Sequence, residues 1–195
     1  MKTHISIFAI FSLLLFSCKK DRLDETIFIP DEDNFELPAY TEWGYNAFGA
    51  VYELETINSR YNAAPCKIVY KNGALDFSLI GRISNFKAAT LTFSFPLLPE
   101  VKTIFDLDVL HDLTVNLAEN CTVTLEVNDT QITLEDVSGK LHFKRFQLLR
   151  VDEKINRIIL SGIFDLTFKK NELSETISDG RFDMGITEKD FYYSK

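Results

Sequence analysis

Apolar and polar side chains alternate with a period of two along most of the chain after residue 46. In Ala89–Phe95 and Thr122–Val127, apolar residues alternate with threonine, serine or glutamate. In the range 158–168, large apolar residues share one face with Gly162. This period is typical of strands that bury one face in a core and expose the other face to water.

Turn-forming sequences separate these alternating runs. Asn72-Gly73 lies between two of them and is a strong hairpin signal. The ranges 128–130 and 152–156 separate further pairs of runs. The spacing predicts an all-β fold, a single antiparallel β-sandwich or barrel-like domain of about nine strands over residues 41–195. Residues 97–113 break the alternation and predict a strand, a short helix or both.

The N-terminus has the pattern of an export signal. Residues 1–4 include a lysine, and residues 5–16 are almost entirely apolar before Ser17 and Cys18. As a helix, this apolar run would extend about 18 Å, which is shorter than the roughly 30 Å hydrocarbon core of a bilayer. Residues 1–17 are therefore predicted to be a secretory signal peptide rather than a transmembrane helix.

The end of this signal, Leu15-Phe16-Ser17-Cys18, resembles the bacterial lipobox, although Phe16 is bulkier than the residue usual at its position. The resemblance implies that Cys18 is acylated and anchors the mature protein in a membrane. The alternative is a plain signal peptide with an incidental cysteine. Residues 18–40 are rich in acids and hold no sustained period, which predicts a lipidated flexible tether. Its Lys-Lys-Asp start is similar to the segment that sends Bacteroidota lipoproteins to the outer face of the outer membrane, so we favour the cell surface over the periplasm.

Three segments carry a second resemblance. Ser161–Leu166 reads SGIFDL, Ile177–Asp183 reads ISDGRFD, and Asn46–Val51 reads NAFGAV. These segments resemble the closing strand pair and the opening strand of a family of uncharacterised Bacteroidota lipoproteins, although Glu53–Glu55 replaces the family's usual Asn-Gly-Lys turn. The resemblance implies an all-β, lipid-anchored domain. It implies no catalytic residue, because the family has no established activity.

The net charge and the spacing of the histidines argue against nucleic acid and metal ions as ligands. The formal net charge is −8, and no stripe of lysine and arginine is present, which argues against nucleic acid as a partner. His111 and His142 are far apart in sequence and match no zinc motif. The cluster of Asp106, Asp108, His111 and Asp112 lacks the glycine and closing glutamate of a calcium loop. We therefore predict no metal ion and no cofactor, and we name no catalytic residue.

Three aromatic residues, Tyr40, Trp43 and Tyr45, precede the first expected strand. Flat aromatic rings at this position suit stacking on sugar rings. They also suit covering the open end of the core, which is the simpler interpretation.

Two cysteines remain after Cys18. In an oxidising compartment, Cys66 and Cys121 can form a disulfide bond, which would stabilise the fold by roughly 4 kcal/mol. The alternative is a pair of buried free thiols that behave as small apolar side chains.

The closing strands are expected to form a hairpin that turns near residues 171–175. In the predicted register, Phe164 faces Phe182, and Asp165 faces Arg181 as an oppositely charged cross-strand pair. Gly180 suits a bulge in the second strand. Arg181 and its acidic neighbours are therefore interpreted as hairpin stabilisers rather than catalysts.

The combined hypothesis is a non-catalytic, lipid-anchored outer-membrane module that binds a glycan, a protein or another envelope component. One alternative is a polysaccharide-directed hydrolase with unidentified carboxylates. Another is a structural subunit of the envelope that adds an edge strand to a neighbour.

The membrane anchor is tested by the substitution Cys18→Ala. Removing the acylated thiol should release the protein from the membrane fraction or block its maturation, as measured by fractionation and by the mass of the mature protein. An unchanged mass together with unchanged membrane association would contradict the anchor.

Overall fold

The computed structural model describes residues 25–194 except 63, 85, 152 and 153. Its strands are β1 (Ala47–Tyr52), β2 (Glu55–Asn58), β3 (Cys66–Lys71), β4 (Ala74–Ile83), β5 (Lys87–Phe95), β6 (Leu113–Asn116), β7 (Thr122–Val127), β8 (Thr130–Ile132), β9 (Glu135–Val151), β10 (Lys154–Lys170), β11 (Leu173–Ile186) and β12 (Phe191–Ser194). The helical segments are the short helix α2 (Leu117–Asn120) and the 3-10 helices η1 (Ile104–Leu110) and η2 (Glu188–Asp190).

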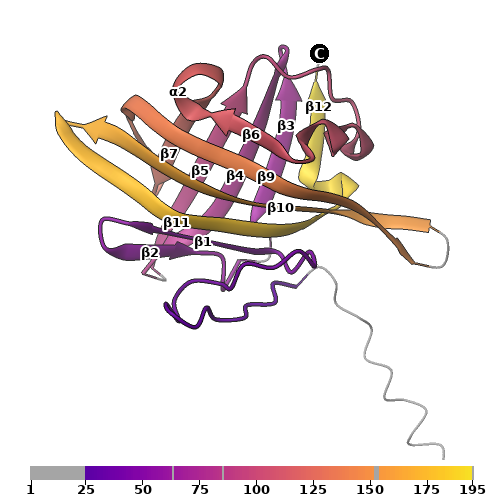
Figure 1. The fold of residues 1–195 in the computed structure, drawn as a ribbon, viewed down its shortest axis with the longest axis horizontal. Coiled ribbons are helices and arrows are strands. Elements are labelled where there is room, and N and C mark those ends of the chain that lie inside the picture. Colours follow the sequence, from indigo (N-terminus) through magenta and orange to yellow (C-terminus); the bar gives the residue numbers. More distant parts are fainter. Residues whose placement is uncertain (1–24, 63, 85, 152–153, 195) are drawn as a thin grey trace, which may run out of the picture.

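The strands form one curled sheet with the order β6-β9-β10-β11-β1-β2-β4-β5-β7-β8. Strand β3 pairs with β4 and β12, and the β12–β3 pair is parallel whereas the other pairs are antiparallel. The long strands β9, β10 and β11 cross in front of β3, β4 and β5, so the sheet curls over itself as a half-barrel (Figure 1). The prediction of an all-β sandwich or barrel-like domain is confirmed, although short strands such as β2, β8 and β12 raise the strand count above the expected nine.

Phenylalanine rings fill the space inside the curled sheet. Phe77 on β4 contacts the rings of Phe182 on β11 and Phe143 on β9, with centroids 5.1 and 5.5 Å apart. Phe93 on β5 meets Phe164 on β10 edge-on at 5.3 Å. These pairs join the two halves of the sheet, since each takes one ring from either side.

The β10–β11 hairpin forms as expected, but its predicted register is wrong. Arg181 lies opposite Ile163 rather than Asp165. The hairpin closes through the two residues Asn171 and Glu172, both with positive φ, whereas the prediction used a longer loop. The shorter turn shifts the two strands relative to one another, so Asp165 and Arg181 no longer lie opposite each other.

Two glycines of the hairpin, Gly162 and Gly180, each lie beneath a phenylalanine ring. Gly162 faces Phe182, and a Cβ atom on Gly162 would lie 2.7 Å from that ring. Gly180 faces Phe164, where a Cβ atom would lie 2.5 Å from the ring. The register shifts beside Gly180, between Phe164 and Leu166 of β10, so the bulge expected there is confirmed. The two glycines therefore allow the rings to cross from strand to strand.

Cys66 and Cys121 are free thiols in the structure, so no disulfide bond joins them. Cys66 is buried, whereas Cys121 is only partly buried, so the alternative of two buried thiols holds for Cys66 alone. Cys66 begins β3 and Cys121 precedes β7, and strands β4 and β5 lie between them. Three strand spacings of about 4.8 Å exceed the roughly 7 Å limit between bridged Cα atoms. Burial raises the pKa of the Cys121 thiol to about 12 and that of Cys66 well above its ordinary value.

Candidate functional site

Residues 25–45, here called the N-terminal strap, lie against the outside of β1 and β11. Leu37 is only 1% exposed, and the backbone N–H of Ala39 donates to the carbonyl of Ile29 at 2.7 Å. Leu37 and Pro38 cover Gly49 of β1, where a Cβ atom would lie 2.3 Å from Pro38 Cδ. The prediction of a flexible tether is therefore wrong for residues 25–40, because Gly49 leaves room for them to pack. Residues 18–24, including the predicted lipid attachment at Cys18, lie outside the described residues.

A buried carboxylate holds the end of the strap. Asp183 of β11 is 2% exposed and accepts hydrogen bonds from the backbone N–H groups of Trp43, Gly44 and Tyr45 at 3.0, 2.7 and 3.3 Å. The Thr41 hydroxyl donates to the same carboxylate at 2.5 Å. Four donors compensate the burial of this charge and fix the backbone around Trp43.

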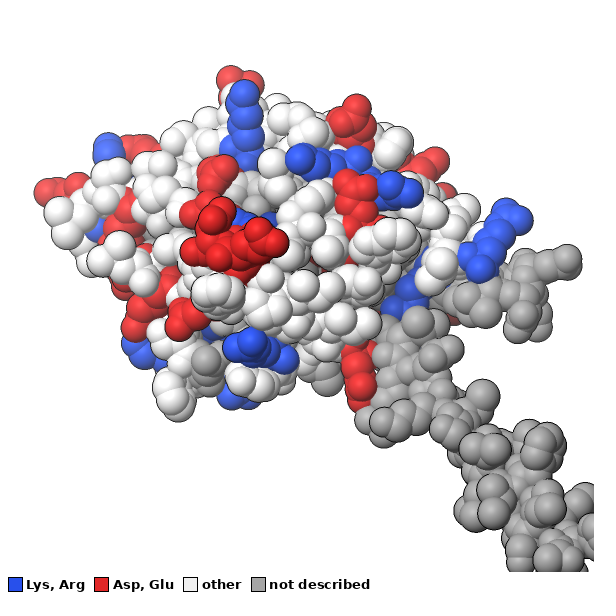
Figure 2. All heavy atoms as spheres, turned by 60° about the horizontal axis from the view of Figure 1, so that its bottom comes forward, with Lys and Arg blue, Asp and Glu red and all other residues white. Residues whose placement is uncertain are grey.

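A second contact from β11 holds the first half of the strap. Arg181 Nη1 lies 2.6 Å from Asp31 Oδ2 in the strap, and its Nε donates to the backbone carbonyl of Asp179 in the hairpin at 3.1 Å. A hydrogen bond from the Asp33 backbone N–H and the charge of Arg181 lower the pKa of Asp31. Further acidic side chains gather on the face that carries the strap (Figure 2). Arg181 therefore joins the strap to β11, whereas Asp165, its predicted partner, accepts a hydrogen bond from the Asp179 backbone N–H.

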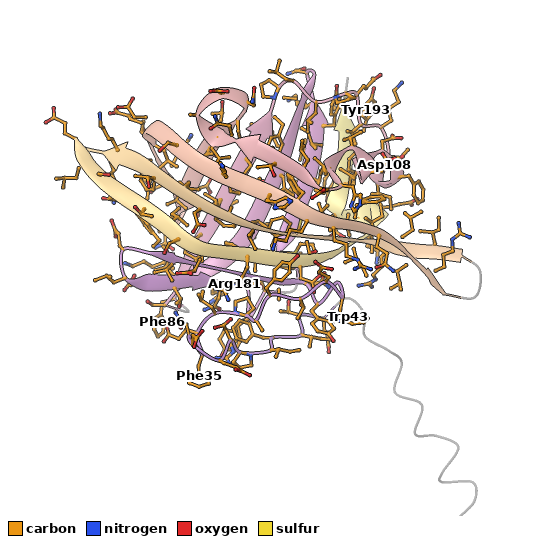
Figure 3. The ribbon with its side chains drawn as sticks, in the orientation of Figure 1. Phe35, Trp43, Phe86, Asp108, Arg181 and Tyr193 are labelled. Atoms are coloured by element: carbon orange, nitrogen blue, oxygen red, sulfur yellow. The ribbon has the colours of Figure 1, made fainter. Side chains whose placement is uncertain are left out.

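A shallow groove opens beside the loop that Asp183 holds. Trp43 is 70% exposed and points outward from the strap (Figure 3). The covering role favoured for the three aromatics is therefore wrong for Trp43, because most of its indole surface is in solvent. The groove is lined by Tyr40, Thr41, Glu42, Trp43, Arg145 and Gln147.

Hydrogen bonds fix the polar side chains of this groove. The Tyr40 hydroxyl donates to Glu42 Oε1 at 2.9 Å and lies 3.3 Å from Ser161 Oγ. Arg145 Nη1 donates to Glu42 Oε2 at 3.0 Å, and its Nε donates to Gln147 Oε1 at 2.9 Å. The groove thus presents a carboxylate, a guanidinium and an amide in positions that their mutual contacts define.

The titration of Tyr40 and Glu42 follows from these contacts. Burial raises the pKa of Tyr40 to about 12. The hydrogen bond from Tyr40, together with the hydrogen bond and charge of Arg145, lowers the pKa of Glu42. At neutral pH the groove therefore holds an ionised Glu42 and a neutral Tyr40.

The structure brings together two of the three aromatic residues singled out from the sequence. Tyr40 and Trp43 line the groove, whereas Tyr45 is half-buried and its carbonyl accepts a hydrogen bond from the Ile27 backbone. Sequence reasoning missed Arg145 and Gln147, which lie about a hundred residues away on β9. Their spacing of two residues on a strand indicates a shared face, but not which loop that face meets.

The acidic and histidine cluster does not form a site. His142 Nε2 lies 3.0 Å from Asp112, and His111 Nδ1 accepts a hydrogen bond from the Phe146 backbone at 3.2 Å. Asp106 accepts hydrogen bonds at the start of η1. Within the described part of the chain, no three potential ligands lie close enough to hold a metal ion.

Comparison with known proteins gives no relative: no family model, no curated protein and no solved structure matches this chain. Among the described residues, no helix is both long and apolar enough to span a bilayer.

The role of the buried carboxylate is tested by Asp183→Asn. An amide removes the charge and turns an NH₂ group toward backbone donors, so the free energy of unfolding should fall by roughly 2–3 kcal/mol. Urea denaturation measures the loss, and limited proteolysis should show faster cleavage near Trp43. The matched control is Asp179→Asn on the same strand, where the exposed side chain predicts a change within about 0.5 kcal/mol. Equal stability of the two variants would contradict this role.

Proposed function

We propose that the protein is a lipid-anchored outer-membrane module that binds a glycan in the groove between the N-terminal strap and β9. The observation that carries the proposal is the exposed indole of Trp43 beside side chains already fixed by hydrogen bonds. An aromatic face in water suits the apolar C–H face of a sugar ring, because both surfaces are flat and lose hydration when they stack.

The polar residues of the groove suit the hydroxyl groups of the same ligand. Glu42 offers acceptor oxygens, while Arg145 and Gln147 offer donors, and these groups keep one another in place before a ligand arrives. Preorganised side chains lose little conformational freedom on binding, which favours affinity for a small polar ligand.

The anchor and the location complete the proposal. The signal pattern ending at Cys18 supports acylation, and the Lys-Lys-Asp start of the mature chain, with the acids that follow it, supports display at the cell surface. The SGIFDL and ISDGRFD segments support a relationship to the Bacteroidota lipoprotein family. A surface-displayed module would meet glycans from outside the cell or from its own envelope.

The geometry favours binding over hydrolysis. A glycoside hydrolase needs two carboxyl groups about 5–10 Å apart that flank the scissile bond, and one of them must hold a proton. Of the residues that line the groove, Glu42 alone is a carboxylate, and its pKa is lowered rather than raised. The nearby carboxylate of Asp183 is buried and committed to four hydrogen bonds. Neither group is therefore suited to act as a general acid.

The glycan site is tested by screening the purified protein on a glycan array and repeating the screen with Trp43→Ala. Loss of the stacking surface should weaken binding of any retained glycan about 5–30-fold, which corresponds to roughly 1–2 kcal/mol. Trp43→Phe should retain part of the affinity because a flat ring remains. Tyr192→Ala, which removes an exposed ring on β12, serves as the matched control and should bind as the wild type does. Equal binding by the Trp43→Ala variant would contradict the site.

A further inference from the structure

The outer side of the N-terminal strap and two neighbouring turns expose a set of large nonpolar side chains, here called the nonpolar patch. The most exposed are Phe86, at 87%, and Phe35, at 71%. The patch consists of Ile27, Ile29, Phe35, Tyr61 and Phe86. Water-exposed aromatic rings that project from one edge of a protein, as those of Phe35 and Phe86 do, indicate a surface that contacts something else.

Hydrogen bonds connect the segments that carry the patch. The Thr26 hydroxyl donates to the carbonyl of Asn62, next to Tyr61, at 2.8 Å. The Thr56 hydroxyl donates to Glu36 at 2.9 Å, and the Thr56 carbonyl accepts from the Ser84 backbone at 3.1 Å. These contacts place the turn of Phe86 beside the turn of Phe35, and both rings project from the same edge of the molecule (Figure 3).

The length of chain between the anchor and the strap limits how far this face can lie from the membrane. Seven residues lead from Cys18 to Glu25, where the described strap begins. A fully extended chain of that length spans at most about 25 Å. The predicted tether of residues 18–40, if fully extended, would have spanned about 75 Å. If Cys18 is acylated, as the proposed function requires, the strap is the part of the domain held nearest to the bilayer.

We infer that the nonpolar patch docks on the interfacial region of the bilayer that holds the anchor. Aromatic rings and isoleucine partition favourably into the boundary between headgroups and acyl chains. The anchor makes this contact intramolecular, so even a weak preference for the interface orients the domain. Trp43 lies at the far end of the same edge from Phe35 and Phe86, and docking through the patch leaves its groove at the rim (Figure 3).

The charge of the strap selects the kind of lipid. The turn around Phe35 carries the exposed acids Glu32, Asp33 and Glu36. Figure 2 shows acidic side chains gathered on this face, with lysine and arginine side chains around them. Carboxylates near the headgroups are repelled by anionic lipids and tolerated by zwitterionic ones. The inferred occupant is therefore a zwitterionic lipid surface.

The test replaces the natural anchor, so that its result does not depend on acylation of Cys18. Residues 19–195 with a hexahistidine tag in place of Cys18 are bound to phosphatidylcholine vesicles that contain nickel-chelating lipid. Trp43 is the one tryptophan of the sequence, which allows single-tryptophan proteins to be compared. In the wild type, the fluorescence of Trp43 reports on the groove. In the variant Phe35→Trp/Trp43→Phe, the fluorescence of the tryptophan at position 35 reports on the patch. Brominated lipids then quench whichever indole lies within the bilayer.

Docking predicts that the tryptophan at position 35 is quenched at least twofold more strongly than Trp43. Adding Phe86→Ser to the position-35 reporter should reduce its quenching, and replacing part of the phosphatidylcholine with phosphatidylglycerol should reduce it further at low salt. No quenching at position 35 would overturn the inference and would point to a protein partner for the patch. Equal quenching at both positions would also overturn the inference, because the domain would then contact the bilayer without a preference for the nonpolar patch. These results do not depend on acylation of Cys18, because the hexahistidine tag replaces the natural anchor.

Discussion

The conformation of the N-terminal strap depends on one buried charge, the carboxylate of Asp183. An isolated carboxylate in the protein interior is strongly unfavourable, and Asp183 is tolerated because three backbone N–H groups and one hydroxyl converge on it. All four donors belong to residues 41–45, so satisfying the charge requires that this loop adopt one conformation. The sheet thereby dictates the structure of a segment that has little periodicity of its own.

Two consequences follow from that constraint. The loop presents Trp43 to solvent and Tyr40 to Glu42, which together with β9 create the proposed glycan groove. It also ends a strap whose start is held by the hydrogen bond from Thr26 to the Asn62 carbonyl and whose first half is held by the ion pair between Asp31 and Arg181. Because both ends of the strap are held, the chain available to separate the domain from a lipid on Cys18 is short. The proposed binding site and the proposed membrane contact therefore share one structural cause.

The sequence was sufficient for the strands and insufficient for the contacts between distant segments. Alternation is a local property, and it predicted strands such as Ala89–Phe95 within β5. The hairpin register depended on whether the turn used two residues or five, and the apolar pattern accepted both. The strap was misread because Leu37 buries itself against Gly49, a contact that no local pattern contains. Arg145 and Gln147 were missed for the same reason, since only the folded sheet brings β9 to the strap.

The most direct test of the account measures hydrogen exchange at residues 41–45 in the native protein. The amides of Trp43, Gly44 and Tyr45 donate to Asp183, so they should exchange as slowly as amides of β1 and far more slowly than an unstructured chain. Exchange of these three amides at the rate of an unfolded peptide, with β1 still protected, would show that the strap is a tether after all. That result would remove the basis of both the groove and the orientation at the membrane.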